Sequence, residues 1–394
     1  MDAVAAPRKT TYESIASPES LAAALSIGLP TLQQAIALPA EEKYTVDTRP
    51  KADGGERVIH KPHHLVRLAQ RRINNRIFKS IICWPSYLYG SIPNHRNELG
   101  HEISKDYIAC AKQHCGAKSL LKMDVKDFFS NVHRDIVAEV FQEFLSFPQE
   151  VSELLTELCT FNEHLVQGAL SSPYLANLAL YDVEADIVRR LAQKGLTYTR
   201  YVDDITVSSR ISRYDFSFAI NIIEGMLTNK GLPINSAKTK IIYSSTQPLT
   251  VHGLRICFKE PRLPADEAKK IRSAVQNLEK IAAEKNYRCT HAYRHDFNRC
   301  MGRVNKLGRV KHSQHRKLVK RMLAIYPLPS KKDIDRVKLI VFRLERDNPT
   351  KKDTYWYSRR FYLAHERLNI LKRSYPNVSK ELRHKLKKLK PTYD

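Results

Sequence analysis

Long apolar runs and a framework of paired cysteines are both missing from this sequence. No window approaches the roughly 18–20 consecutive apolar residues that span a bilayer, and the N-terminus lacks the basic-then-apolar pattern of a secretory signal. The seven cysteines include no C-x-x-C pair, and their odd number disfavours a set of disulfides. We therefore expect a cytoplasmic protein that has no membrane partner.

Acidic residues are also in short supply. The chain has 41 Asp and Glu against 66 Lys and Arg, which gives a formal net charge of +25 and predicts a polyanionic partner. The excess is uneven, because residues 262–394 hold 36 basic and 13 acidic residues, whereas residues 1–261 hold 30 and 28. The last third of the chain is therefore the expected place for contacts with nucleic acid.

The composition is that of a folded protein. Apolar residues make up 42% of the chain, with 13 Gly and 19 Pro, so most of it should fold. At 394 residues the chain exceeds the roughly 250–300 residues at which single hydrophobic cores stop growing, so several packed subdomains are expected. The clearest break between them is Pro327-Leu328-Pro329-Ser330.

Hydrophobic periodicity predicts an α+β body followed by a helical region. Ser17-Pro18-Glu19 is typical of a helix start, and Gly28-Leu29-Pro30 of a helix end. The strand patterns span residues 44–61 (as a hairpin), 119–125, 198–202, 205–209, 241–244 and 250–258. The helix patterns span residues 63–83, 134–145, 148–160, 172–193, 216–230 and 264–326. We expect the strands of the body to form an antiparallel sheet with helices on one face.

Two adjacent carboxylates, Asp203 and Asp204, interrupt the strand patterns. Because Asp is a poor strand former and like charges repel, this pair at a hairpin tip is costly unless a divalent cation binds it. Another strand pattern ends at Asp124, which in the same sheet gives the geometry for two metal ions roughly 3.5–4 Å apart. We therefore predict a Mg²⁺ site at Asp124, the adjoining Val125, Asp203 and Asp204. An ordinary Asp-Asp turn, or Asp127 in place of Asp124, is the alternative.

Six segments resemble, in order along the chain, the successive motifs of reverse transcriptases. They are Gly55-Glu56-Arg57-Val58-Ile59-His60-Lys61-Pro62, Met123-Asp124-Val125-Lys126-Asp127-Phe128-Phe129, Gln167-Gly168-Ala169-Leu170-Ser171-Ser172-Pro173, Tyr201-Val202-Asp203-Asp204, Leu232-Pro233-Ile234-Asn235-Ser236-Ala237-Lys238-Thr239 and Val251-His252-Gly253-Leu254. Six ordered matches form a highly specific signal.

The resemblance implies a right-hand polymerase with fingers, a palm and a helical thumb. The corresponding ranges are an N-terminal helical cap (1–43), the first part of the fingers (44–118), the palm with embedded fingers helices (119–261), the thumb (262–328) and a basic aromatic C-terminal extension (329–394). It also implies an RNA-directed DNA polymerase that uses dNTPs and two Mg²⁺ ions, with Mn²⁺ as a substitute.

Residue roles follow from the matched motifs. Asp124 and Asp203 resemble the principal metal ligands and catalytic carboxylates, and Asp204 completes them. Phe129 matches the aromatic gate that excludes a 2′-hydroxyl, and Lys238 matches the lysine near the leaving pyrophosphate. The full set implied to bind the nucleotide is Arg57, Lys61, Phe129, Gln167, Gly168 and Lys238.

Within the family, the chain is most similar to bacterial retron and retron-like enzymes. The place of the retron Asn-Ala-x-x-His element is held by Cys110-Ala111-Lys112-Gln113-His114, and Val-Thr-Gly appears as Val251-His252-Gly253. The resemblance implies that the chain copies a structured noncoding RNA into single-stranded DNA, as part of antiphage defence with a toxin or effector protein. The alternatives are a defence-associated enzyme of a non-retron type, which makes repetitive or differently primed DNA, a catalytically idle RNA-binding scaffold, and a maturase-like splicing partner.

RNA and the RNA–DNA product need cations along a surface. From the retron elements and the basic thumb we predict RNA contacts at His114, His252, Gly253, Arg303, Arg309, Lys311, Arg316 and Lys317. Aromatic residues further along have two interpretations, because they suit either stacking on unpaired bases or packing of a helix. They include Trp356, Tyr357 and Phe361, which together with Leu363 could form the apolar stripe that packs a helix.

A zinc site is a weaker hypothesis. Cys289, His291, His295 and Cys300 have spacings that suit zinc, but the local pattern is helix and turn without a cysteine pair, which disfavours it.

Overall fold

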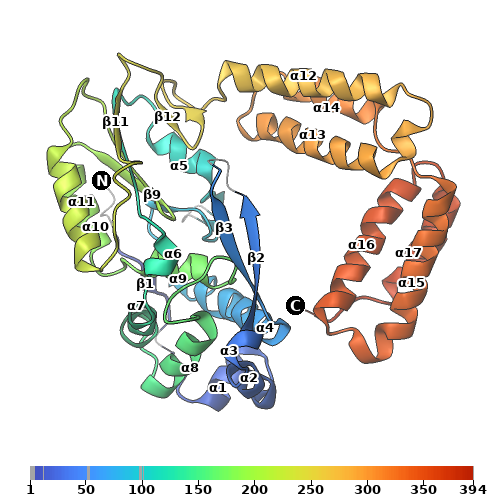
Figure 1. Cartoon of the computed structure of the whole chain (residues 1–394), viewed down its shortest axis with the longest axis horizontal. Helices are drawn as coiled ribbons and strands as arrows, with labels where there is room; N and C mark the ends of the chain where they lie inside the picture. Colours follow the sequence, from blue (N-terminus) through green and yellow to red (C-terminus); the bar gives the residue numbers. More distant parts are fainter. Residues whose placement is uncertain (1–4, 12, 51–53, 97–99, 101, 394) are drawn as a thin grey trace. The chain divides into compact units, whose positions relative to one another are not determined.

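The computed structural model describes residues 5–11, 13–50, 54–96, 100 and 102–393. The chain forms two compact units, Met1–Arg262 and Leu263–Asp394 (Figure 1). Among the described residues, no helix combines the length and the apolar character that crossing a bilayer requires.

The first unit is built around a five-stranded sheet. Its strand order is β11 (Lys240–Tyr243), β8 (Ser119–Asp124), β10 (Asp204–Ser209), β9 (Thr197–Tyr201) and β5 (Leu88–Tyr89). The first four strands are antiparallel neighbours, as predicted, whereas β5 pairs with β9 in parallel at the edge. This two-residue strand is too short for a period-2 pattern to reveal it. The α+β polymerase fold class is confirmed.

Helices cover both faces of this sheet. On one face the apolar side chains Leu121, Ile205 and Val207 are buried in the main core, beside α10 (Glu184–Gln193) and α11 (Ser217–Asn229). The opposite face carries Asp124 and Asp204, because side chains alternate along a strand. In Figure 1 helix α5 (Tyr107–Gln113) lies on the other side of the sheet from α10 and α11. We expected helices on one face only, so α5 on the other face was not predicted.

The remaining helices of the first unit pack mainly around one core. They are α1 (Pro18–Leu25), α2 (Leu29–Ile36), α3 (Ala40–Lys43), α4 (His64–Ile73), η1 (Asn74–Phe78), α6 (Phe128–Asn131), α7 (Arg134–Glu139), η2 (Val140–Phe144), α8 (Gln149–Cys159) and α9 (Ser172–Leu178).

Two helix boundaries differ from the sequence patterns. Helix α2 begins at Leu29 with Pro30 in its first turn, where proline costs no hydrogen bond, so Gly28-Leu29-Pro30 starts a helix as well as ending one. The pattern over 172–193 is two helices, α9 and α10, separated by a turn over residues 179–183. The start after Ser17 is confirmed, because Ser17 and Ser20 form a reciprocal capping box.

Four short sheets complete the first unit. The predicted hairpin is β2 (Tyr44–Pro50) paired with β3 (Glu56–Pro62). Asp53, between the two strands, lies outside the described residues. The others are β1 (Arg8–Lys9) with β4 (Ile82–Cys83), β6 (His95–Arg96) with β7 (Glu102–Ile103), and β12 (Thr250–Val251) with β13 (Leu254–Arg255).

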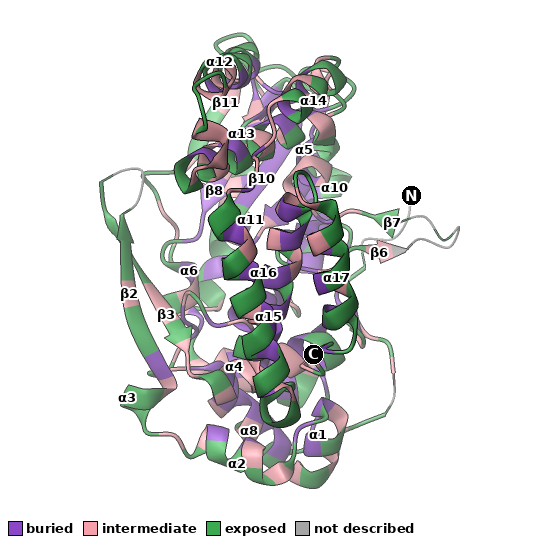
Figure 2. Cartoon of the chain, turned by 90° about the vertical axis from the view of Figure 1, so that its right-hand side faces the viewer, coloured by how far each residue is buried: buried purple, intermediate pink, exposed green. Residues whose placement is uncertain are grey.

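The second unit is described by helices alone. One group comprises α12 (Ala265–Ala282), η3 (Tyr287–Cys289), α13 (His291–Arg309) and α14 (His315–Ala324), and another comprises α15 (Lys331–Lys351), α16 (Tyr355–Leu371) and α17 (Pro376–Lys387). The second group has a buried core that includes Tyr357 and Phe361. In Figure 2 the outer faces of α15, α16 and α17 are mostly exposed. The breaker Pro327–Ser330 separates the two groups.

Candidate active site and nucleic-acid surface

The three predicted carboxylates meet at the ends of two neighbouring strands. Asp124 is the last residue of β8 and is the register partner of Asp204, the first residue of β10. Asp203 lies in the two-residue turn between β9 and β10, and the Val125 backbone N–H donates to its carbonyl oxygen at 3.1 Å. The structure thus brings together the residues that the motifs predicted, although they come from segments about 80 positions apart in the sequence.

The turn that carries Asp203 is strained. Its first central residue, Val202, has φ +60°, a region in which a β-branched side chain is an outlier and which Gly normally fills in such hairpins. A conformation of this kind costs about 1–3 kcal/mol and persists where the surrounding structure holds it. This turn is therefore fixed by its neighbours and not by its own sequence.

Electrostatic repulsion couples the three acids. Burial and the nearby Asp124 charge raise the pKa of Asp203. Burial, followed by the charges of Asp203 and Asp124, raises the pKa of Asp204 to about 6. Three mutually repelling carboxylates at one edge of a sheet are a set of hard oxygen donors that suits a divalent cation such as Mg²⁺.

Asp124 already has cationic and amide partners. Its carboxylate is only 8% exposed, and the Lys238 ammonium donates to its two oxygens at 2.9 and 3.1 Å. The Asn235 side-chain amide donates to Oδ2 at 3.1 Å, and its backbone N–H donates to the Asp124 carbonyl at 2.8 Å. No three His, Cys, Asp or Glu side chains within the described ranges stand in a ready-made metal cluster. The oxygen donors fit a metal ion. In this structure the Lys238 ammonium supplies positive charge at the Asp124 carboxylate, where such an ion would bind.

The predicted nucleotide-binding residues come from several elements of the first unit. Arg57 and Lys61 are exposed on β3, and the Arg57 charge lowers the pKa of Asp203, so Arg57 lies within electrostatic reach of the site. Lys61 also pairs with Asp47 at 2.7 Å. Phe129 is half-buried in α6, and its ring centroid is 6.3 Å from that of Phe128.

The loop at Gln167 and Gly168 is tied to the β2–β3 hairpin. The His60 backbone N–H donates to the Gln167 carbonyl at 2.7 Å. Gly168 has φ +110°, and a Cβ on it would lie 2.3 Å from the His60 carbonyl oxygen, so only glycine fits. This loop therefore keeps a fixed position against the strand that carries Arg57 and Lys61.

His114 is not available for RNA, which corrects the prediction made for it. Its side chain is buried, with Nδ1 2.7 Å from the Ser208 hydroxyl and Nε2 2.8 Å from the Thr199 hydroxyl. Burial lowers its pKa to about 3, so the ring is neutral and fastens α5 to the sheet. The sequence alone could not distinguish this role from an exposed one.

The other retron element packs against the same face. The His252 ring lies 4.6 Å from the Tyr201 ring, and its Nε2 is 3.3 Å from the Cys110 sulfur. The two positions at which the sequence departs from the retron pattern, Cys110 and His252, therefore contact each other. The His252 side chain is 13% exposed, whereas Gly253 is exposed, so Gly253 is the more accessible of the two for RNA.

The thumb cations predicted to bind RNA are all exposed on α13, the following turn and α14. They are Arg303, Arg309, Lys311, Arg316 and Lys317. Other cations of these helices have structural partners, since Lys306 pairs with Glu267 and Arg321 with Glu279. Part of the basic charge thus holds the helices together, and part faces solvent.

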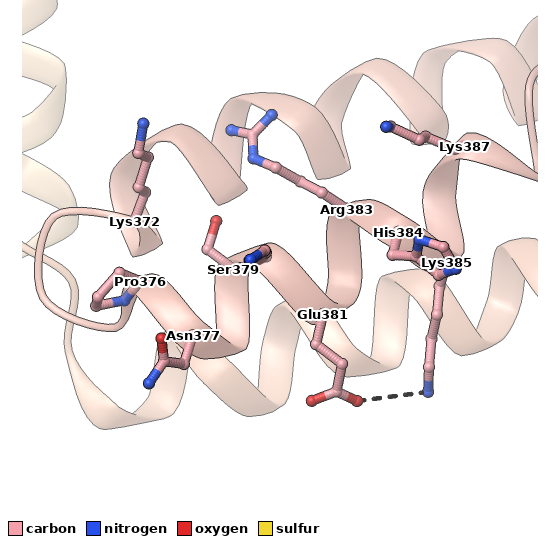
Figure 3. Close-up of a pocket in the computed structure, with 10 residues that line it drawn as sticks. Lys372, Pro376, Asn377, Ser379, Glu381, Arg383, His384, Lys385 and Lys387 are labelled. Carbon is pink, nitrogen blue, oxygen red and sulfur yellow. Dashed lines mark ion pairs between the residues drawn. The ribbon is translucent and has the colours of Figure 1, made fainter.

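A basic groove of about 920 Å³ lies on the last helix pair (Figure 3). Lys372, Arg383 and Lys387 point to one side of α17 in Figure 3, while Glu381 pairs with Lys385 on the other at 3.8 Å. Arg383 also donates to the Asn369 side chain at 2.6 Å. The motifs did not single out this groove. Its signal in the sequence is the excess of cations in the last third of the chain.

The aromatic residues with two interpretations separate by burial. Tyr357 and Phe361 are 2% and 7% exposed and pack the helices, whereas Trp356 and Leu363 are 62% and 39% exposed. The Arg359 guanidinium lies 5.4 Å from the centre of the Trp356 ring. The packing interpretation therefore holds for Tyr357 and Phe361, and stacking on unpaired bases stays a prediction for the exposed Trp356.

The residues of the zinc hypothesis do not form a cluster. Cys289 is half-buried in η3, Cys300 is buried in α13, and His291 and His295 are exposed. In the part of the chain that the structure describes, no group of three such ligands is found.

Comparison with known proteins identifies the family. The family model described as "Reverse transcriptase (RNA-dependent DNA polymerase)" matches residues 49–289. The retron Ec48 reverse transcriptase of Escherichia coli is 47% identical over 369 residues, which cover 93% of this chain and 90% of that protein. The retron Se72 reverse transcriptase of Salmonella heidelberg (strain 579083-10) is 30% identical over 348 residues, covering 85% and 86%.

Among solved structures, a telomerase from Candida albicans in complex with a fragment of telomeric RNA has a TM-score of 0.38 and 9% identity, over 87% of this chain and 65% of that chain. This similarity is too low to carry an argument. The family match and the two near-full-length relatives agree with the ordered motifs. The chain belongs to the retron reverse transcriptases, and it is an RNA-directed DNA polymerase.

Proposed function

We propose that this reverse transcriptase copies a dedicated structured noncoding RNA into single-stranded DNA, using dNTPs, and that the product serves antiphage defence together with a toxin or effector protein. The observation that carries the catalytic part is the pairing of Asp124 with Asp204 across neighbouring strands, with Asp203 in the adjoining turn. The template and the defence role rest on the retron relatives.

Asp124, Asp203 and Asp204 are proposed to hold two Mg²⁺ ions, with the backbone at Val125 beside them. Such ions, when bound, activate the attacking oxygen and stabilise the leaving oxygen of an in-line phosphoryl displacement. Lys238, whose side chain is 61% exposed, would then leave the Asp124 carboxylate and approach the leaving pyrophosphate. While Lys238 remains paired with Asp124, that hydrogen bond raises its pKa.

The incoming nucleotide is proposed to lie between the hairpin and the acids. Arg57 and Lys61 would hold its triphosphate by charge, and Gln167 and Gly168 would line its base and the template. Phe129 would exclude a 2′-hydroxyl by steric contact. The close approach of Gly168 to His60 supports this proposal, because it ties the lining loop to the strand that carries the two cations.

RNA and the RNA–DNA product are proposed to bind exposed cations of the second unit, namely Arg303, Arg309, Lys311, Arg316 and Lys317. Gly253, with His252 beside it, is a further proposed contact in the first unit. The groove at Lys372, Arg383 and Lys387 extends this set. Cations that follow a phosphate backbone give affinity without reading the sequence.

The test is to purify the full chain with its bound nucleic acid and to sequence what copurifies, for the wild type and for Asp203→Ala/Asp204→Ala. We expect one RNA with covalently attached complementary DNA, and RNA without DNA in the variant. Repetitive DNA without an attached RNA would instead indicate a non-retron defence enzyme. RNA that is the same in both proteins would indicate an idle scaffold.

A further inference from the structure

We propose that Arg200 is a positioning residue for catalysis, because it fixes the central peptide of the strained turn that presents Asp203 and Asp204. The proposal rests on the function proposed above, in which these carboxylates hold the metal ions. Arg200 does not touch the nucleotide or the metal in this account. It acts through the backbone carbonyl of Val202.

Arg200 is buried completely, and its donors bind three separate elements. Nε and NH2 donate to the two carboxylate oxygens of Glu184 on α10, each at 2.6 Å. NH2 also donates to the Asn177 carbonyl at the end of α9, at 2.9 Å. NH1 donates to the Val202 carbonyl in the catalytic turn, at 3.1 Å. One planar guanidinium thus links two helices of the body to the turn.

The Val202 carbonyl belongs to the peptide that decides the type of turn. In a two-residue hairpin, rotation of the central peptide interconverts the II′ turn, with positive φ only at its first central residue, and the I′ turn, with positive φ at both. Here Val202 has φ +60°, whereas φ of Asp203 is not positive. Asp tolerates positive φ well, so the sequence itself does not prevent the other form. The bond from Arg200 holds the carbonyl in the observed orientation.

Arg200 is in turn held rigidly. Glu184, 1% exposed, also accepts from the Tyr198 hydroxyl at 2.7 Å, so the buried charges are paired and hydrogen-bonded. The Asn177 side chain donates to the Gly90 carbonyl at 3.1 Å. Gly90 lies directly against the Tyr201 ring, with 2.8 Å between its hypothetical Cβ and that ring. The frame therefore fixes both Tyr201 and Val202, the residues that precede the two acids.

A buried ion pair alone would explain stability but not this geometry. Glu184 and the Asn177 carbonyl use only the Nε and NH2 groups of the guanidinium. The NH1 group reaches past the helix–strand interface to Val202 in the turn. A lysine could pair with Glu184 but has no second arm for the turn. Without the hydrogen bond from NH1, we expect φ of Asp203 to become positive and its carboxylate to be misplaced. Misplacement by about 1 Å can lower the rate about 100-fold.

The experiment compares Arg200→Lys with Arg134→Lys in the full chain. Arg134 also pairs with a glutamate, Glu157, in the same unit at 2.8 Å, and serves as the matched control. The measurements are thermal unfolding, Mn²⁺ binding by electron paramagnetic resonance, and kcat and KM for a dNTP on a primed RNA. For Arg200→Lys we expect Mn²⁺ affinity to fall about 10-fold and kcat about 100-fold, with KM for the dNTP within about threefold. Arg134→Lys should change each by less than about twofold.

A second variant covers the case in which Arg200→Lys does not fold. Replacing the whole buried group by apolar residues, as Arg200→Met/Glu184→Leu/Tyr198→Phe, removes the charges together, which proteins often tolerate. We expect this triple variant to fold and to have the same loss of Mn²⁺ affinity. Wild-type Mn²⁺ binding and kcat in a folded Arg200 variant, single or triple, would overturn the proposal.

Asp203→Asn separates this failure from failure of the metal site itself. If Asp203→Asn binds Mn²⁺ as the wild type does, the carboxylates do not hold the ion, and both proposals are wrong. If Asp203→Asn loses Mn²⁺ while the Arg200 variants keep it, only the positioning role is wrong.

Discussion

The two units of the chain use charge in opposite ways. In Met1–Arg262 charges beside the predicted site are paired, since Arg200 and Glu184 are both buried and Lys238 donates to the buried Asp124. In the second unit cations outnumber acids by more than two to one, and most of them are exposed on helices. Phosphoryl transfer needs charges held at fixed positions, whereas binding of a polyanion needs a density of charge over a surface. The difference supports the proposal that the first unit carries out the chemistry and the second binds nucleic acid.

The largest expected effect comes from removing one of the three carboxylates of the first unit. Asp124→Asn keeps the shape of the side chain and removes one metal-binding charge. We expect DNA synthesis to fall by at least about 1000-fold, because two-metal catalysis depends on every carboxylate. Binding of the copurifying RNA should stay within about threefold, because the variant leaves the second unit intact. Primer extension and filter binding measure the two, and an equal loss in both would contradict the division of roles.

The reverse change in the second unit should spare the chemistry. Lys372→Glu/Arg383→Glu/Lys387→Glu reverses three charges at the groove of Figure 3. We expect RNA affinity to fall about 100-fold at moderate salt. The slope of log affinity against log salt should become less steep by about 2, because each lost contact with single-stranded RNA contributes about 0.7. At saturating RNA the rate of nucleotide addition should be unchanged. An unaltered salt slope would show that the groove does not contact phosphate.

A smaller effect tests the exposed aromatic residues. Trp356→Ala removes a ring that is 62% exposed, so stability should change by less than about 0.5 kcal/mol. If the ring stacks on an unpaired base, RNA affinity should fall about fivefold or more. Tyr357→Phe is the control for packing, because this hydroxyl donates to the Leu389 carbonyl at 2.8 Å and its loss should cost about 1 kcal/mol without changing RNA affinity. Fluorescence anisotropy and chemical denaturation report the two quantities.

The smallest effect is a difference in pH dependence between the units. The pKa of Asp204 is raised to about 6, so the folded protein binds more protons than the unfolded chain between about pH 4 and pH 6, and stability falls as pH rises through this window. Because the carboxylate is half exposed, we expect only about 1 kcal/mol. Buried groups with a lowered pKa, such as His114, add stability over the same interval in the wild type and in Asp204→Asn alike. Chemical denaturation of the metal-free protein at pH 4.5 and pH 7 should therefore show a change that is less favourable to folding, by this amount, in the wild type than in Asp204→Asn.

In the second unit the sign is opposite. Burial raises the pKa of Asp333, but the hydrogen bonds from Arg294 and Ser330 outweigh it and lower that pKa to about 2. Its contribution to stability is therefore complete above about pH 4 and is lost as pH falls toward 2. Asp333→Asn should leave the change between pH 4.5 and pH 7 as it is in the wild type, and a change there would contradict the assignment to Asp204.

Much of the catalytic site was predictable from local sequence. Asp124 ends an apolar strand and Asp203-Asp204 interrupts two others, so the strand patterns already placed three carboxylates at strand ends. The family resemblance supplied the roles of Phe129, Gln167 and Lys238, which no local pattern gives. The helix break between α9 and α10 and the parallel strand β5 escaped prediction, because both depend on packing against distant segments.

The sequence by itself determined the charge division of the chain and predicted the three metal-binding acids, because composition and strand periodicity are local properties. Only the tertiary structure decided which polar residues are exposed and which hold the fold. His114 lies inside, bonded to two hydroxyls, and Arg200 lies beneath the catalytic turn. The physical reason is that burial and hydrogen-bond partners arise from residues far apart in sequence, and a motif does not record them.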